Sequence, residues 1–199
     1  LLNEQITKNP KNVDILVDAV RLILRMGKRD MAKSYLLKLK QLSPSNPEGL
    51  KFTGAIAEEE GKFNEALSIY EEAFRNDPKD LDIIKYLAEI YIRKEMWNKA
   101  ILHLRRALDS YPNMPFLLEG LGNILITCPD TGLINVDEGR EYSERAYINY
   151  KSNLPVIISA GRNLAKAYAI LGDKQKAAWY LNQSNSKSKE ENFPKGLFQ

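Results

Sequence analysis

Residues 47–78 read PEGLKFTGAIAEEEGKFNEALSIYEEAFRNDP, and this stretch decides the fold. Pro47 suits the first turn of a helix, where its missing N–H removes no hydrogen bond. Gly61 suits the end of that helix, because glycine adopts the left-handed conformation easily. Ala66 and Tyr70 lie on the apolar stripe of a second helix, which Pro78 ends. The stretch therefore predicts a hairpin of two antiparallel helices.

The same hairpin recurs along the chain with a period of 34 residues. The columns in register are Pro10, Pro44, Pro78 and Pro112, with Ala32, Ala66 and Ala100. A period of this length indicates an array of helical hairpins, in which each unit buries its apolar face against its neighbours.

The unit resembles the tetratricopeptide repeat (TPR), whose signature joins W-x2-L-G-x2-Y to a later A-x3-F and a proline. The second and third repeats carry it at Leu50, Thr53, Gly54, Ala57, Ala66, Tyr70 and Pro78, and at Ile84, Leu87, Ala88, Tyr91, Ala100, Leu104, Ala107 and Pro112. A looser match begins at Leu16, and the form returns at Leu164. The resemblance covers nearly the whole chain. It implies an all-α fold, a right-handed superhelical solenoid of antiparallel helix hairpins with about five TPR-like repeats.

The register also divides the chain. We expect repeats near 11–44, 45–78, 79–112, 113–153 and 154–187, which together form a solenoid over residues 11–187. Residues 1–10 align with the end of a truncated preceding repeat, so we expect the chain to be a fragment of a longer protein. Residues 188–199 lose the pattern and are predicted to form a C-terminal tail.

The fourth repeat contains an insertion, within LITCPDTGLINVDEGR at residues 125–140. Pro129 predicts that the first helix ends at Cys128, and Asp137 is the predicted N-cap of the second helix. The apolar residues between them are predicted to pack against the hairpin: Leu133, Ile134 and Val136. The Thr-Cys-Pro-Asp element resembles a TPR variant of large bacterial multidomain proteins, in some of which the repeats accompany a sulfatase or kinase domain.

The sequence offers no set of residues suited to catalysis. Cys128 is the single cysteine and His103 the single histidine, and the two belong to different repeats. A calcium loop is excluded at DTGLINVDE, since Gly132 and Ile134 stand where oxygen ligands are required. We therefore predict that the chain is not an enzyme and holds neither a metal nor a cofactor. Both tryptophans, Trp97 and Trp179, are predicted to lie in the core.

Composition restricts the class of partner. The net charge of +3 is too small to indicate nucleic-acid binding. No apolar run approaches the roughly 20 residues that a membrane-spanning helix needs. Residues 1–45 carry nine Lys and Arg against four Asp and Glu, whereas residues 46–78 carry three against eight. Bacterial cytoplasm and periplasm are both compatible with these numbers.

Binding of a peptide or protein partner is the function that these observations leave. In a TPR-like solenoid the first helix of each hairpin lines a concave groove. Side chains of these helices that point away from the second helix are the predicted partner-binding residues: Arg21, Arg25, Lys51, Ala55, Glu58, Lys85, Glu89, Arg93, Glu119, Asn123, Arg162 and Lys166. The clamp by which some TPR proteins hold the C-terminal carboxylate of chaperones is not matched, because Ala55 and Glu89 stand where it requires asparagines.

Two alternatives to a free-standing scaffold stay open. One is an accessory TPR domain of a larger multidomain enzyme, with these repeats positioning its catalytic domain or substrate. The other is a self-associating module, in which apolar surface between repeats, around Leu16 and Val20, packs on a second copy.

Overall fold

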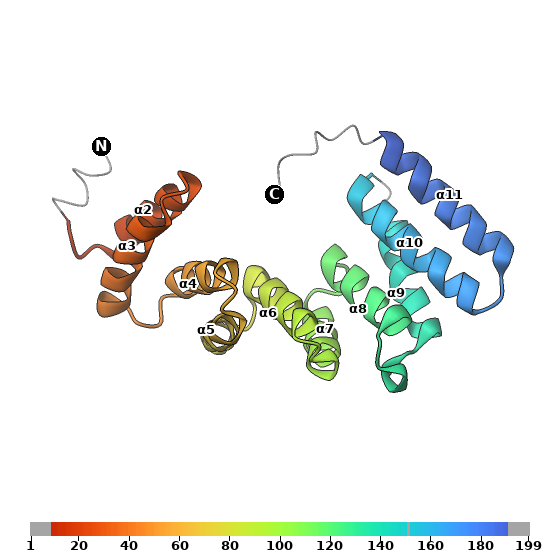
Figure 1. Cartoon of the computed structure of the whole chain (residues 1–199), viewed down its shortest axis with the longest axis horizontal. Helices are drawn as coiled ribbons and strands as arrows, with labels where there is room; N and C mark the ends of the chain where they lie inside the picture. The colour runs from red at the N-terminus through yellow and green to blue at the C-terminus, as the bar shows by residue number, and fades with distance from the viewer. Residues whose placement is uncertain (1–8, 151, 191–199) are drawn as a thin grey trace. The chain divides into compact units, whose positions relative to one another are not determined.

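The computed structural model describes residues 9–150 and 152–190, and within them every regular element is helical (Figure 1). The α-helices are α2 (Val13–Arg25), α3 (Arg29–Leu42), α4 (Pro47–Glu59), α5 (Phe63–Asn76), α6 (Leu81–Arg93), α7 (Trp97–Ser110), α8 (Pro115–Thr127), α9 (Val136–Asn149), α10 (Leu154–Ile170) and α11 (Lys174–Glu190). A short 3-10 helix, η1 (Thr131–Leu133), lies between α8 and α9. The prediction of an all-α helical solenoid is confirmed.

The chain divides into two compact units, Leu1–Lys94 and Glu95–Gln199. In the first unit, α2 packs on α3 and α4 packs on α5, while α4 also contacts α2 and α3, and α6 packs on α5. In the second unit, α8 packs on α9, α9 on α10 and α10 on α11, while α7 packs on α8 and α10 also packs on α8. Most of the predicted preceding-repeat end and tail lies outside the described residues, although α11 continues to Glu190.

Helix starts follow the 34-residue register. Asn12, Asn46 and Asp80 precede α2, α4 and α6, and each side chain accepts a hydrogen bond from a backbone N–H of the first turn. These bonds satisfy N–H groups that have no partner inside the helix. Met114 holds the next place in the register before α8, and its side chain makes no such bond.

The first two turns between paired helices follow the same register. Gly27 and Gly61, 34 residues apart, hold left-handed φ angles of +71° and +74°, and Gly172, which follows the insertion, holds +86°. The predicted helix end at Gly61 is therefore confirmed. Glu95 occupies the corresponding position after α6 and holds a φ of +57°, the single non-glycine residue with a positive φ in the described chain.

Glycine also permits close helix crossings. A Cβ atom added at Gly54 of α4 would lie 2.4 Å from Cε1 of Tyr70 of α5, so the tyrosine ring occupies the space above that glycine. At Gly122 of α8 an added Cβ would lie 2.6 Å from Oγ of Ser143 of α9. Both distances are shorter than real Cβ contacts, so these two hairpins depend on glycine for their spacing.

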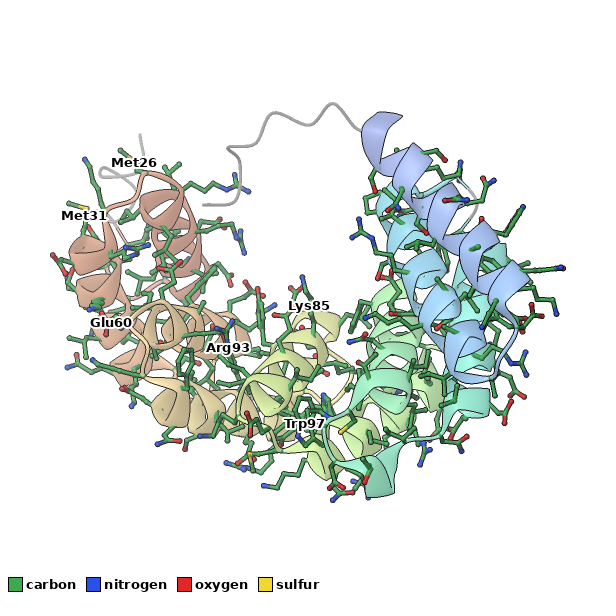
Figure 2. All side chains as sticks on the ribbon, turned by 45° about the vertical axis from the view of Figure 1, so that its right-hand side comes forward. Met26, Met31, Glu60, Lys85, Arg93 and Trp97 are labelled. Carbon is green, nitrogen blue, oxygen red and sulfur yellow. The ribbon has the colours of Figure 1, made fainter. Side chains whose placement is uncertain are left out.

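The core of the first unit corrects one expectation. Leu16 and Val20 are 1% and 0% exposed, and they lie in one apolar cluster with Leu36, Leu39 and Ile56. The expected exposed apolar surface around Leu16 and Val20 is therefore wrong, because α3 and α4 cover both residues. The exposed large apolar residues of this hairpin are instead Leu22, Met26, Met31, Leu37 and Leu42; Figure 2 labels the two methionines.

The inserted segment of the fourth repeat is ordered as a short connection. α8 ends at Thr127, and the buried Cys128 follows as its C-cap. The N-cap of α9 is Asn135, whose side chain accepts from the backbone N–H of Glu138 at 3.2 Å. The prediction of Asp137 as the cap is wrong. A helix capped by Asp137 would begin at the next residue, whereas α9 begins two residues earlier, at Val136. Of the apolar residues, Leu133 and Val136 are half-buried and Ile134 is exposed.

The expectation for the tryptophans is also corrected. Trp97 is half-buried, and Trp179 leaves 52% of its surface exposed. Tyr180, the next residue on α11, takes the inner position instead. Its ring stacks on Tyr168 with centroids 5.6 Å apart and meets Tyr147 edge to face at 5.4 Å, so Trp179 is turned outward.

Candidate functional site

The predicted partner-binding residues divide between the two units. Those on the first unit are Arg21, Arg25, Lys51, Ala55, Glu58, Lys85, Glu89 and Arg93, and those on the second are Glu119, Asn123, Arg162 and Lys166. On the first unit they lie on α2, α4 and α6, and we call this surface the first-helix face.

Ion pairs link the three helices of the first-helix face. An Arg21 nitrogen lies 3.4 Å from the Glu48 carboxylate, which joins α2 to α4. Lys51 contacts Glu48 on its own helix, and its Nζ lies 3.0 Å from Asp80 and 3.4 Å from Asp82. The network thus continues from α4 to the start of α6. Arg21 and Lys51, both predicted to contact a partner, are already paired within the protein.

Lys51 is the most enclosed cation of this network, with 11% of its side chain exposed. Burial alone would lower its pKa, but the hydrogen bonds to Glu48 and Asp80 outweigh burial and raise the pKa above its ordinary value. Its charge is therefore fixed at physiological pH and compensated by neighbouring acids. Lys51 acts in this structure as a connection between successive hairpins.

A hollow of about 350 Å³ lies on the first-helix face between α4, α5 and α6. Its lining consists of Ala55, Glu58, Glu59, Phe63, Tyr70, Tyr86, Glu89 and Arg93. Four of these are predicted site residues: Ala55, Glu58, Glu89 and Arg93. The structure therefore brings together residues of two successive repeats, as binding of one ligand group requires.

Aromatic rings form part of the hollow. Tyr70 of α5 and Tyr86 of α6 stack with ring centroids 5.1 Å apart and planes 20° from parallel. The Tyr70 hydroxyl donates to the Glu58 carboxylate at 3.5 Å. Because Gly54 leaves room for the Tyr70 ring, a position of the TPR signature also shapes the hollow. The stack gives the hollow an aromatic wall held in place by the core.

Arg93 shows what kind of group the hollow accommodates. Its guanidinium carbon lies 5.1 Å from the centre of the Phe63 ring, and one of its nitrogens lies 3.6 Å from Glu58. A cation over an aromatic face beside a carboxylate is a favourable arrangement. Figure 2 labels Arg93 and Lys85 on α6.

The lining of the hollow carries three acids and one base. Glu58, Glu59 and Glu89 share it with Arg93, while two cations outside the lining contact these acids: Arg29 lies 2.6 Å from Glu59, and Lys85 lies 3.8 Å from Glu89. Burial raises the pKa of the Glu89 carboxyl, and the nearby Glu58 carboxylate raises it further. Lys85, which lies 3.8 Å away, opposes this shift. Two carboxylates that disfavour each other's charge make a site that favours a bound cation.

Sequence reasoning missed half of the hollow. Phe63 and Tyr70 belong to a second helix, and the prediction considered only first helices. Tyr70 also matches the TPR signature and was assigned to the core, where it is fully buried, yet it also belongs to the lining of the hollow. Tyr86 lies beside the predicted Lys85 on α6. An aromatic residue next to a predicted groove position is the signal that could have identified it.

The predicted residues of the second unit occupy different surroundings. Arg162 donates to the Ser188 hydroxyl at 3.3 Å, Asn123 accepts from Thr127 at 3.3 Å, and Lys166 is exposed. Glu119 on α8 is the enclosed member of the group.

Burial raises the pKa of the Glu119 carboxyl, and a hydrogen bond from Ser159 opposes the shift. The Oε1 atom of Glu119 is buried with no hydrogen-bond partner among the described residues. Asn163 on α10 donates to the Glu119 backbone carbonyl at 3.5 Å. The carboxyl of Glu119 is therefore enclosed at the α8–α10 contact with one of its oxygens unsatisfied.

The described part of the chain contains neither a membrane-spanning helix nor a cluster of metal ligands. None of its helices combines the length and apolarity that crossing a bilayer requires. Its His, Cys, Asp and Glu side chains form no group of three or more that would hold a metal ion.

Comparison with known proteins places these hairpins in a family. Residues 57–116 match the family model described as tetratricopeptide repeat. A stretch of 74 residues is 35% identical to the photosystem I assembly protein Ycf3 of Synechococcus sp. (strain CC9605). That alignment spans 36% of this chain and 43% of Ycf3.

Solved structures share the fold at low sequence identity. MamA from Desulfovibrio magneticus RS-1 superposes with a TM-score of 0.74 at 15% identity, over 91% of this chain and 97% of that one. YrrB, whose structure is described as a TPR protein with an unusual peptide-binding site, gives 0.74 at 17% identity, over 96% and 93%. The Pseudomonas aeruginosa protein pilF gives 0.74 at 15% identity, over 95% and 85%. The sequence match identifies tetratricopeptide repeats over residues 57–116, and the solved structures share the helical-repeat fold of the chain.

Proposed function

We propose that this chain is a non-catalytic scaffold that binds a peptide or protein partner, and that the hollow between α4, α5 and α6 receives a basic side chain of that partner. The observation that carries the proposal is the hollow, in which aromatic rings stand beside three carboxylates and one guanidinium. TPR proteins act through protein partners, and this site gives the chemistry of one contact.

The partner's basic group has two kinds of attraction available. The exposed part of the Tyr86 ring offers a cation–π contact, and Glu89 offers a charge-assisted hydrogen bond. Arg93 supports this assignment, since its own guanidinium is held beside Phe63 and Glu58 in the same manner. A Lys or Arg of the partner would also relieve the repulsion between Glu58 and Glu89.

The relatives are consistent with this role without defining the partner. Ycf3 is named as an assembly protein, and YrrB is described as having a peptide-binding site. We infer by analogy that this chain holds components of a larger assembly together. The identity of those components is to be established by direct capture.

The experiment is site-specific photo-crosslinking in cells that produce the protein. A crosslinking amino acid replaces Lys85, which is half-exposed beside the hollow, and in a parallel control it replaces the exposed Glu141 on α9. We expect a partner to be captured from position 85 and not from position 141, and mass spectrometry then gives the captured segment.

Charge specificity is tested on that captured segment. Glu89→Gln combined with Tyr86→Leu should weaken its binding about tenfold, since a cation–π contact and an ion pair are both lost. Replacing the segment's basic residue by norleucine should cause the same loss, with no further effect in the double variant. Binding that both changes leave intact would refute the assignment of the hollow.

A further inference from the structure

The opposite side of the first unit contains a second, independent surface. Two adjoining cavities of about 200 and 350 Å³ lie between α3 and α5, and four residues line both of them: Leu36, Lys40, Thr53 and Glu65. The shared lining makes the cavities one continuous channel, which we call the α3–α5 groove. Its floor is the side of α4 that carries Thr53, facing away from the first-helix face.

Thr53 on α4 keeps this groove open. Gly49 and Thr53 line it, with Leu39 lying against Gly49, whereas the residues 34 positions later are Ile83 and Leu87, both fully buried. One more repeat along, the same positions hold Leu117 and Leu121, which are also buried. Bulky side chains thus occupy these positions in the next two repeats, and the second repeat lacks them.

The groove has an apolar interior with an exposed edge. Leu36 and Ile56 lie 6% and 5% exposed along it, and Ile69 is half-buried. Leu37, on the α3 side, leaves 65% of its surface exposed, the largest value among the exposed large hydrophobic residues of the described chain. A partner that covers Leu37 would bury apolar surface that now faces solvent.

The two walls carry opposite charges at the same spacing. Lys33 and Lys40 lie seven residues apart on α3, and Glu65 and Glu72 lie seven residues apart on α5. Seven residues are two helical turns, about 10.5 Å along the axis, so each pair lies on one face of its helix. Lys33 is engaged by Glu60 at the open end of the groove, where Figure 2 labels that glutamate. No ion pair joins Lys40, Glu65 or Glu72 to another residue of the described chain.

We propose that the α3–α5 groove is a docking site for one amphipathic helix of a protein partner. The occupant presents an apolar stripe to the groove, an acidic edge to α3 and a basic edge to α5, each edge repeating every seven residues. An α-helix is the structure that repeats its side chains at this interval, and helices bind such grooves through their apolar stripe. The site lies apart from the hollow and does not depend on the function proposed for it.

The test uses two stapled helical peptides of about 14 residues, since unstapled helices of this length are marginal in water. Both have the same composition and a leucine stripe. The segregated peptide carries Glu at both heptads of one edge and Lys at both heptads of the other. The alternating peptide carries Glu at the first heptad and Lys at the second on both edges. Reversing the direction of the segregated peptide exchanges its edges, so one of its two orientations in the groove matches the walls.

The wild-type protein should bind the segregated peptide about tenfold more tightly than the alternating one in isothermal titration calorimetry, because only the former places no like charge against a wall residue. In the variant Lys40→Glu with Glu65→Lys, each wall alternates in sign, and the preference should reverse. An unchanged preference would overturn the proposed arrangement of the two edges.

Blocking the groove supplies a second test. Thr53→Leu introduces the residue that later repeats carry at this position and should reduce binding of the segregated peptide at least about tenfold. Thr53→Val keeps the side-chain volume and should leave binding unchanged, and circular dichroism checks that both variants fold. Glu89→Gln, in the hollow, should also leave binding of the segregated peptide unchanged. The proposed occupant is wrong if the Thr53→Leu variant binds the peptide normally. It is also wrong if sedimentation experiments show a dimer for the wild-type protein and a monomer for the Thr53→Leu variant.

Discussion

Gly61 and Glu95 occupy the same position of successive repeats, 34 residues apart, and both hold a left-handed backbone, with φ of +74° and +57°. Glycine adopts this conformation freely, whereas the Cβ of glutamate approaches a carbonyl oxygen, which costs about 1–2 kcal/mol. The turn between paired helices therefore imposes its geometry even where the residue type is unsuited to it.

Replacing Glu95 by glycine should stabilise the protein. The change removes the left-handed strain, and part of the gain is offset because glycine makes the unfolded chain more flexible. We expect the free energy of unfolding to rise by about 0.5–1 kcal/mol in urea titration. Gly61→Ala is the matched control and should lower it by a similar amount. A less stable Glu95→Gly variant would show that the glutamate side chain makes a stabilising contact.

Met114 offers a second position for stabilisation. Asn12, Asn46 and Asp80 hold its place in the earlier repeats, and each caps its helix, whereas Met114 gives α8 no side-chain cap. Met114→Asn should raise the free energy of unfolding by about 1 kcal/mol, because it offers a side-chain acceptor to the first turn, where the N–H of Leu117 now reaches the Met114 carbonyl at 3.2 Å.

The control for this change is the reverse one, Asn46→Ala. It removes the hydrogen bond to Gly49 N, 2.8 Å long, and should lower stability by about 1 kcal/mol. A rise at position 114 without a fall at position 46 would mean that the gain comes from something other than capping.

The periodic features of the fold could be predicted from the sequence, because they depend on local geometry repeated in register. Gly61 is an example: glycine at a fixed place in the repeat ends the first helix. The insertion has no second copy in the chain, and there the prediction of Asp137 as a cap was wrong. Asn135 takes that role because the backbone of this loop, tied to Leu125 by a 2.9 Å hydrogen bond, starts α9 at Val136.

The candidate site could be predicted only in part. The rule that groove residues point away from the second helix selected Glu58 and Arg93, and both line one hollow. The same rule selected Lys51, but that residue pairs with Asp80, which is 29 positions away and belongs to the next hairpin. Whether an outward charge is free or paired depends on how successive hairpins stack, and the spacing within one hairpin does not contain that information.

Removing the Lys51 charge should destabilise the first unit. Lys51→Met leaves Glu48 and Asp80 without their cation in a largely enclosed position, so we expect a loss of about 1–2 kcal/mol at pH 7. Because the folded-state pKa of Lys51 lies above its ordinary value of 10.5, this contribution is fully present at pH 7 and is lost only as the pH rises above 10.5 through that folded-state pKa.

The control is Lys85→Met, whose half-exposed pair with Glu89 spans 3.8 Å and should contribute less than about 0.5 kcal/mol. Urea titration of both variants at pH 7 separates the two cases. Equal losses would contradict the view that enclosure distinguishes Lys51 from the other predicted cations.

The enclosed carboxyl of Glu119 should make stability depend on pH in the opposite sense. Its folded pKa lies above the ordinary value of 4.5, so the folded state is disfavoured increasingly as the pH rises through the window above 4.5. Glu119→Gln cannot ionise and should raise the free energy of unfolding at pH 7 by about 1 kcal/mol, with a smaller gain at pH 4. Glu141→Gln, an exposed position of the same unit, should change stability at neither pH. A gain at position 119 that is equal at both pH values would assign the effect to packing, because ionisation alone distinguishes the two conditions.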